Sequence, residues 1–370
     1  MKVGRIKKIL CDKDSRIREK GTLDKTHQDH RPILAIVMGD ATGIGPEIVA
    51  KSLSTEETHR LCRPVVIGDA RVMTEAIRLA KVNLKIYPLK KWEEASGLGG
   101  RLEIFDLANL DPAEYRMGEV SARAGQACLE YLKFAVDQVM AGRAEATVFA
   151  PLNKQAMSLG GSPFKDELSL FSSWTKPELA GEINVLEPLW TSRVTSHIGF
   201  REICHQLTPD RVFRAILLLE KTMRRAGMER PPIGVVALNP HGGEGGLFGP
   251  EEETIIKPAV ERAKMEGMDA RGPFPADTVF VRARKGEFSG IVTMYHDQGQ
   301  IAMKLLGFDR GVTVAGGLPI VITTPAHGTA HDIAGKGIAD VGAFQAALRL
   351  ATRMAWASKG GQKEGAPTLG

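Results

Sequence analysis

The sequence predicts an α/β protein built from two α/β/α lobes with mostly parallel sheets. Short apolar runs of strand length alternate with helical stretches from residue 32 onward, which is typical of parallel strands covered by helices. The chain has 370 residues, and single hydrophobic cores seldom exceed about 250–300 residues, so two lobes are expected. No apolar run approaches the ~18–20 residues needed to span a bilayer, which excludes a transmembrane protein.

The first lobe is expected over residues 32–150, completed by a return of the chain at about 331–358. Its first strand is the continuous apolar run at 33–38, which is typical of a parallel strand buried on both faces. A glycine-rich turn follows this strand, and Pro46 suits the first turn of a helix. The other elements expected in this lobe are strands at 64–69, 85–87, 102–105 and 146–151 and helices at 73–80, 121–141 and 341–358.

The second lobe is expected over residues 151–330, where the order of strand and then helix repeats. The clearest buried strand of this lobe is the apolar run that begins at Ile233. The elements expected here are strands at 193–197, 233–241 and 290–296 and helices at 209–226 and 251–266.

The net charge of +5 belongs to the N-terminus. Residues 1–31 contain ten Lys or Arg and five Asp or Glu, whereas the rest of the chain holds 39 residues of each sign. We therefore expect a flexible basic extension at 1–31 and a frayed tail at 359–370. Because the body is neutral and only 6% of the residues are aromatic, neither nucleic acid nor a membrane is expected as a partner.

The four cysteines, Cys11, Cys62, Cys128 and Cys204, are scattered and form no CxxC pair. The basic N-terminus lacks the apolar core of a secretory signal. Both features favour a reduced, cytoplasmic compartment with ordinary buried thiols.

Three histidines share one sequence context, since each ends a predicted strand and opens a loop. They are His197, His241 and His296. Ligands of open α/β sheets bind beyond the carboxyl ends of the strands, so three imidazoles there could bind one divalent metal and leave positions open for substrate oxygens. The alternative is three separate, hydrogen-bonded loop histidines. Asp297 would either orient His296 or cap the next turn.

The turn at 39–45, with the sequence GDATGIG, follows the first strand. It fits neither the G-x-G-x-x-G dinucleotide motif nor the G-x-x-x-x-G-K-[ST] phosphate loop. A tight strand-to-helix turn with a structural role is the favoured interpretation, and a Rossmann site is not supported.

The segment 327–339, HGTAHDIAGKGIA, resembles the adenosine-binding loop of isocitrate and isopropylmalate dehydrogenases. Those enzymes carry NAD(P) on such a loop instead of a Rossmann turn. The resemblance implies an isocitrate/isopropylmalate dehydrogenase-like fold with NAD as cofactor. The cofactor contacts that it implies are His327, Gly328, Thr329, Ala330, Asp332 and Ile333.

Further segments resemble the 4-hydroxythreonine-4-phosphate dehydrogenase family of pyridoxal phosphate (pyridoxine) biosynthesis, over about residues 32–356. The segments are 39–47, 150–154, 239–249, 272–280 and 295–299. The resemblance implies that His197, His241 and His296 bind one divalent cation (Zn, Mg, Mn or Co) in a cleft shared across a homodimer. It also implies an NAD-dependent oxidation of a secondary alcohol β to a carboxylate, followed by decarboxylation of the keto acid.

Two more residues are candidates for catalysis. Lys304, eight residues after His296, matches a substrate-binding lysine of that family and is a candidate for proton transfer; the alternative is a solvated helix lysine. Asp277 is a candidate acid or base, or else the N-cap of a helix.

The chain departs from the family pattern where the substrate binds. The family's G-H-T-E segment falls at 164–168, which lacks its His and its Thr, so that Asp166 and Glu167 are the substrate contacts expected here. Thr313, also an expected contact, replaces an asparagine. Ile322 replaces an arginine, and an aliphatic side chain cannot supply the guanidinium fork that reads phosphate.

The dehydrogenase chemistry is therefore expected to be retained, whereas the lost polar contacts allow two classes of substrate. The substrate is either 4-phosphohydroxy-threonine or a different, unphosphorylated hydroxy acid or diol acid. Lys165 either compensates in part for the lost positive charge or is an exposed turn residue. From other classes, a phosphate acyltransferase-like enzyme and a non-catalytic binding protein remain as alternatives.

Overall fold

The structure of the protein, a computed structural model, describes residues 29–358. The predicted tail at 359–370 and residues 1–28 of the predicted extension lie outside the described residues. A compact unit begins at Pro32, where the apolar pattern of the sequence also begins. One sheet runs through this unit, and its division into two lobes near residues 150 and 331 stays a prediction.

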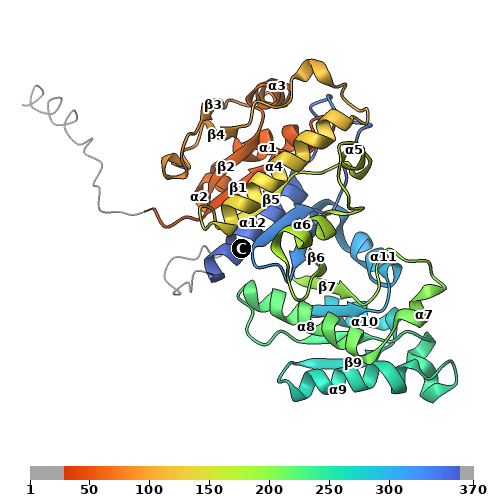
Figure 1. The fold of residues 1–370 in the computed structure, drawn as a ribbon. Coiled ribbons are helices and arrows are strands. Elements are labelled where there is room, and N and C mark those ends of the chain that lie inside the picture. Colours follow the sequence, from red (N-terminus) through yellow and green to blue (C-terminus); the bar gives the residue numbers. More distant parts are fainter. Residues whose placement is uncertain (1–28, 359–370) are drawn as a thin grey trace, which may run out of the picture. The chain divides into compact units, whose positions relative to one another are not determined.

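The sheet has twelve strands in the order β3-β4-β2-β1-β5-β12-β11-β6-β7-β10-β8-β9. Figure 1 shows β3 and β4 toward one end of the sheet and β9 at the other. Eight of the eleven pairings between neighbours are parallel, which confirms the predicted α/β class with a mostly parallel sheet. The strands are β1 (Ile33–Val37), β2 (Arg63–Gly68), β3 (Lys85–Pro88), β4 (Arg101–Asp106), β5 (Ala146–Phe149), β6 (Gly181–Leu186), β7 (Leu189–Arg193), β8 (Ile233–Val236), β9 (Ala270–Phe274), β10 (Gly290–Thr293), β11 (Val312–Gly316) and β12 (Val321–Pro325).

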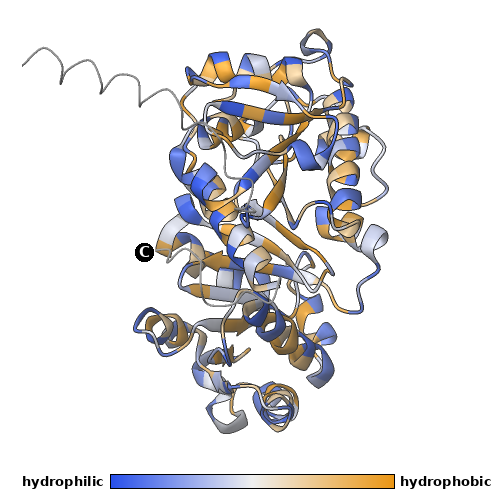
Figure 2. Cartoon of the chain, turned by 90° about the vertical axis from the view of Figure 1, so that its left-hand side faces the viewer, coloured by the Kyte–Doolittle hydropathy of each residue, from blue (hydrophilic) through white to orange (hydrophobic). Residues whose placement is uncertain are grey.

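Helices cover the parallel parts of the sheet. Every residue of β1 is buried, so both faces of the sheet are covered there, as its unbroken apolar sequence predicts. Figure 2 shows hydrophobic residues concentrated in the strands and hydrophilic residues on many outer helical turns. The helices are α1 (Gly45–Leu53), α2 (Glu56–Leu61), α3 (Ala70–Ala80), α4 (Ala122–Met140), α5 (Lys154–Leu159), α6 (Glu167–Thr175), α7 (Glu202–Gln206), α8 (Pro209–Arg225), α9 (Lys257–Met265), α10 (Ala276–Arg284), α11 (His296–Gly307) and α12 (Gly342–Ser358).

The middle of the sheet is antiparallel. β12 pairs with β11, β11 with β6 and β6 with β7, all in antiparallel fashion. The strands beyond β7 therefore run opposite to those of the first part. Except for the end of β7, these strands are not among those expected from the sequence, because their apolar residues alternate with polar ones and form no continuous apolar run.

Three predicted strands end earlier than expected. β7 ends at Arg193, β8 at Val236 and β10 at Thr293, and His296 begins α11 instead of ending a strand. The side chain of Gln298 replaces the ladder at this edge: its Oε1 accepts a hydrogen bond from the backbone N–H of Met294, and its Nε2 donates to the carbonyl of Ala237, both at 2.7 Å. A side-chain bridge of this kind leaves no periodic signal in the sequence.

Two expectations from composition concern the described residues: that the thiols are buried and that no helix spans a membrane. Cys62 and Cys128 are buried, but Cys204 is exposed, so not every thiol is buried as expected. Within residues 29–358 no helix is long and apolar enough to cross a membrane.

A buried ion pair attaches the segment 327–339 to α1. Glu47 is 2% exposed, and its Oε1 accepts hydrogen bonds from Lys51 Nζ at 2.7 Å and from the backbone N–H of Ala339 at 2.8 Å. Lys51 Nζ also donates to the carbonyls of Gly337 and Ala339. The last turn of the segment thus depends on a lysine 286 residues earlier in the chain.

We expect Lys51→Met to lower the free energy of unfolding by about 2–4 kcal/mol, because Glu47 would stay buried without its cation. Lys257→Met is a matched control, since Lys257 forms an exposed pair with Glu253 at the same helical spacing. The control should cost less than about 1 kcal/mol. Denaturant titration measures both, and equal losses would contradict the prediction.

Asp69 at the start of α3 is fully buried and accepts four hydrogen bonds. Its oxygens receive the backbone N–H, Nε and Nη2 of Arg71 and the backbone N–H of Leu110, at 2.8–3.0 Å. Burial alone would raise the pKa of Asp69, but the hydrogen bonds from Arg71 and Leu110 outweigh it and hold the pKa below the usual value of 3.8.

Because the pKa of Asp69 is lower in the folded than in the unfolded chain, its contribution to stability is present at neutral pH and is lost as the pH falls below about 4. We expect Asp69→Asn to lower the free energy of unfolding by about 1–3 kcal/mol at pH 7. The difference from wild type should shrink between about pH 5 and pH 3. Denaturation across this range tests the prediction, and a constant difference would refute it.

Candidate active-site cleft

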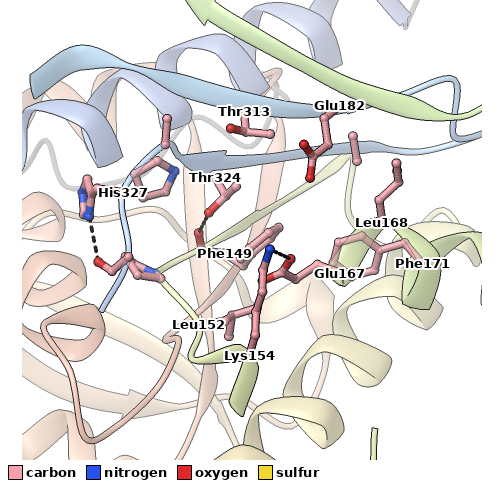
Figure 3. A pocket seen from close by; sticks show the side chains of 15 residues that line it. Phe149, Leu152, Lys154, Glu167, Leu168, Phe171, Glu182, Thr313, Thr324 and His327 are labelled. Carbon is pink, nitrogen blue, oxygen red and sulfur yellow. Dashed lines mark hydrogen bonds and ion pairs between the residues drawn. The ribbon is translucent and has the colours of Figure 1, made fainter. Parts of the chain in front are cut away.

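Two adjoining cavities lie over the antiparallel middle of the sheet. We call the first the histidine cavity; its walls include His197, His296, Lys304, Arg193 and Asn184. The second, the glutamate cavity, is lined by residues that include Phe149, Glu167, Leu168, Phe171, His327 and Gly328 (Figure 3). Lys154, Glu182, Thr313 and Ala326 line both cavities, which therefore form one cleft.

The two-residue period of the middle strands explains this cleft. Ile183 and Val185 of β6 are buried, while Glu182 and Asn184, which alternate with them, line the cleft. Likewise Val312 and Val314 of β11 are buried, and the intervening Thr313 lines the cleft. One face of β11 and β6 thus packs into the core while the other carries polar groups.

The histidine cavity brings together two of the three predicted metal ligands. The ring centroids of His197 and His296 lie 5.6 Å apart. The Nδ1 of His296 is 2.6 Å from Asp297 Oδ1, a contact that would orient the ring and leave Nε2 directed away from the carboxylate. Lys304 lies farther along α11 and lines the same cavity.

His241 lies apart from this pair. It is exposed, lines neither cavity and has a ring contact with Phe248 at a centroid distance of 6.3 Å. Its backbone is left-handed, with φ 53°. It lies in a glycine-rich turn after β8, and the strand does not extend into this turn. Within residues 29–358 no three metal-ligating side chains converge, so a single chain does not assemble the predicted three-histidine set.

A polar network that sequence reasoning missed lies in the floor of the histidine cavity. Asn184 donates from Nδ2 to Thr313 Oγ1 at 3.1 Å, and its Oδ1 accepts from Arg193 at 2.7 Å and from Gln300 at 2.5 Å. Arg193 also forms an ion pair with Glu182. Asn184 and Glu182 on an otherwise apolar strand were the available sequence signal.

The glutamate cavity contains a half-buried ion pair. Glu167 lies 3.5 Å from Lys154 Nζ. A dashed line in Figure 3 marks this ion pair. Burial raises the pKa of Glu167, an effect that the nearby ammonium of Lys154 only partly offsets. Asp166 lines a neighbouring cavity instead and caps α6 by accepting a hydrogen bond from the backbone N–H of Ser169 at 2.7 Å.

The segment 327–339 packs on the turn at 39–45. The backbone N–H of Ile44 donates to the carbonyl of Thr329, and a Cβ at Gly43 would lie only 2.7 Å from the Cβ of Thr329. The Nε2 of His331 is 3.2 Å from Thr42 Oγ1. The turn is therefore a support for the segment, in agreement with the structural role predicted for it.

The remaining predicted residues are distributed as follows. Gly328 and Asp332 are exposed, and His327, Ala330 and Ile333 are partly buried on the same segment. Asp277 is exposed in the first turn of α10, where Pro275 is the N-cap residue, and it lines neither cavity. Ile322 is fully buried in β12, and Lys165 is exposed.

The chain is similar to known proteins over most of its length. Residues 60–351 match the family model of the pyridoxal phosphate biosynthetic protein PdxA. The chain is 43% identical over 332 residues to the D-threonate 4-phosphate dehydrogenase of Cupriavidus necator, covering 88% of this chain and 99% of that protein.

Two crystal structures are also similar. A 4-hydroxythreonine-4-phosphate dehydrogenase from Burkholderia phymatum is 40% identical with a TM-score of 0.77, covering 88% of this chain and 99% of that one. A terephthalate 1,2-cis-dihydrodiol dehydrogenase from Burkholderia xenovorans is 28% identical with a TM-score of 0.62, covering 87% and 98%. By sequence and by fold, the chain belongs to the PdxA family.

Proposed function

We propose that the protein is an NAD- and divalent-metal-dependent dehydrogenase that oxidises a secondary alcohol β to a carboxylate, after which the keto acid loses CO2. The observation that carries this proposal is the continuous cleft. One end holds His197, His296 and Lys304, and the other reaches His327 and Gly328 of the segment that resembles a cofactor-binding loop. A substrate in the cleft would therefore lie between the metal ligands and the nicotinamide.

The donor set at the histidine cavity suits a divalent cation. His197 and His296 present two imidazole ligands, and Asp297 is positioned to hold the His296 ring. Two imidazoles leave several positions for further ligands, which suits a catalytic site. When bound, the cation would act as a Lewis acid toward the alcohol and carboxylate oxygens of the substrate.

The segment 327–339 suits the cofactor. Its exposed Gly328 has open space around it, and the exposed carboxylate of Asp332 can accept hydrogen bonds from a ribose. The hydrogen bond from Ile44 holds the segment at Thr329, and the Glu47–Lys51 pair holds it at Ala339. NAD, when bound, would accept the hydride.

The chain's own residues orient the substrate. The ammonium of Lys304 would pair with the substrate carboxylate or exchange a proton at the adjacent carbon. Thr313 and Asn184 would position the substrate by hydrogen bonds to its hydroxyl groups. Oxidation would move a hydride from the carbinol carbon to NAD and a proton from the hydroxyl group to solvent. The C–C bond to the carboxylate would then break, releasing CO2 and an enolate that takes up a proton to become a ketone.

A second copy of the chain would complete the site. His241 and the candidate acid or base Asp277 both lie outside the cleft of their own chain, and both are exposed. α11, which carries His296 and Lys304, also exposes Ile301 and Leu305 one turn apart, an apolar stripe that suits an interface. We propose a homodimer in the cytoplasm in which His241 of one protomer joins His197 and His296 of the other.

The names of relatives bear on the substrate class. Two are named for phosphorylated hydroxy acids, and one is named for an unphosphorylated cis-dihydrodiol. We propose a small hydroxy acid or diol acid as substrate.

We expect the purified protein to reduce NAD with at least one acid from a panel of phosphorylated and unphosphorylated hydroxy acids, and a chelator to abolish the reaction. Added Mg²⁺, Mn²⁺, Zn²⁺ or Co²⁺ should restore it, because the alcohol needs an electrophile to lose its proton at neutral pH. The measurement is the absorbance of reduced nicotinamide. No turnover with any acid, together with no binding of NAD, would refute the proposed function.

The shared site predicts complementation between inactive variants. His241→Ala and His296→Ala should each lose activity by at least about 100-fold. After the two variants are unfolded and refolded together, half of the dimers would be mixed, and each mixed dimer would hold one intact site. About one quarter of the wild-type activity should return.

The metal bound by each refolded preparation is the second readout. A mixture of His241→Ala with the wild-type chain, unfolded and refolded in the same way, is the control. If all three ligands came from one chain, mixing the two variants would restore nothing. Full activity of His241→Ala alone would remove His241 from the ligand set.

A further inference from the structure

The two ends of the cleft differ in charge. The histidine cavity offers the positive end, with Lys304 and the divalent cation that His197 and His296 would hold. The two cavities share Glu182 and Lys154, and the glutamate cavity adds a second carboxylate, Glu167. A substrate that places its carboxylate near Lys304 would therefore point its other end at these two acids.

The cations near the glutamate cavity already have anionic partners. Lys154 Nζ lies 3.5 Å from Glu167. Arg193 has a side chain only 8% exposed, and its guanidinium forms the ion pair with Glu182 and donates to Asn184 Oδ1 at 2.7 Å and Ser196 Oγ at 2.9 Å. A phosphate would have to displace these partners to gain a cation.

The backbone around the cavity offers little to an anion. The first turn of α6 is where an anion could bind, but Asp166 already accepts the N–H of Ser169, and Glu167 adds a second negative charge there. The floor is apolar, with the rings of Phe149 and Phe171 at a centroid distance of 5.7 Å. Ile322, fully buried in β12, contributes no charge.

The same groups suit hydroxyls. A carboxylate accepts hydrogen bonds from hydroxyl groups, and Thr313 Oγ1 can donate as well as accept. Aromatic rings pack against the C–H face of a polyol or ring. A dianion buried against the same rings would lose its hydrogen bonds to water and gain none from the protein there. The Glu167 side chain is only 17% exposed, so water would screen a further negative charge beside it poorly.

We propose that the glutamate cavity receives an uncharged, hydroxyl-bearing end of the substrate, and that Glu167 is the residue that excludes a phosphorylated one. This inference rests on the proposed dehydrogenase function. Glu167 acts by repelling phosphate and by accepting a hydrogen bond from a substrate hydroxyl.

The test compares D-threonate with D-threonate 4-phosphate, two acids that differ only in the phosphate. Isothermal titration of each into the full chain loaded with Mn²⁺ and NADH gives both affinities, because the reduced cofactor cannot accept a hydride and neither acid is turned over. We expect wild type to bind D-threonate at least about tenfold more tightly than the 4-phosphate, and Glu167→Gln to narrow this ratio by about tenfold, because like charges at short range are costly.

Glu266→Gln at the exposed end of α9 is the matched control, since it removes the same charge far from the cleft and should leave the ratio unchanged. Tighter binding of the 4-phosphate by wild type, an unchanged ratio in Glu167→Gln, or binding of neither acid would overturn the inference. Absence of hydride transfer with the binding ratio as expected would refute the proposed dehydrogenase function alone.

Discussion

The reversal of strand direction in the middle of the sheet is the constraint on which the cleft depends. Parallel strands need helical crossovers, which cover both faces, but β11, β6 and β7 are joined in antiparallel pairs. One face of these strands is therefore left for Glu182, Asn184 and Thr313 instead of a packed helix. The core on the other face stays continuous, so the molecule combines a rigid sheet with a polar, solvent-accessible cleft across it.

The elements with continuous apolar sequences could be predicted well. β1, α4, α8 and α12 lie within one or two residues of their expected ranges, because burial on both faces of a strand and a long apolar helical stripe leave strong periodic signals. β6 and β11 could not, since alternation of small polar and apolar residues over five or six positions is common in loops as well. The ends of β8 and β10 were overestimated because Gln298 replaces the ladder there.

Part of the candidate site could be predicted from the sequence. His197, His296 and Lys304 share a cavity as expected, and Thr313 and Glu167 line the cleft. Sequence could not reveal that His241 lies outside it, because three strand ends at one edge look equivalent until the left-handed turn after β8 is seen. It also could not find Arg193 and Glu182, whose pairing joins residues on adjacent strands.

α11 sets a length scale for the chemistry. His296 and Lys304 lie on the same helix, eight residues apart, so their Cα atoms are separated by about 12 Å along its axis. Because this helix is continuous, the two side chains cannot approach each other without a change of rotamer. The helix therefore acts as a ruler: it fixes the separation of the two backbone positions, and no loop movement can bring the lysine ammonium closer to the imidazole.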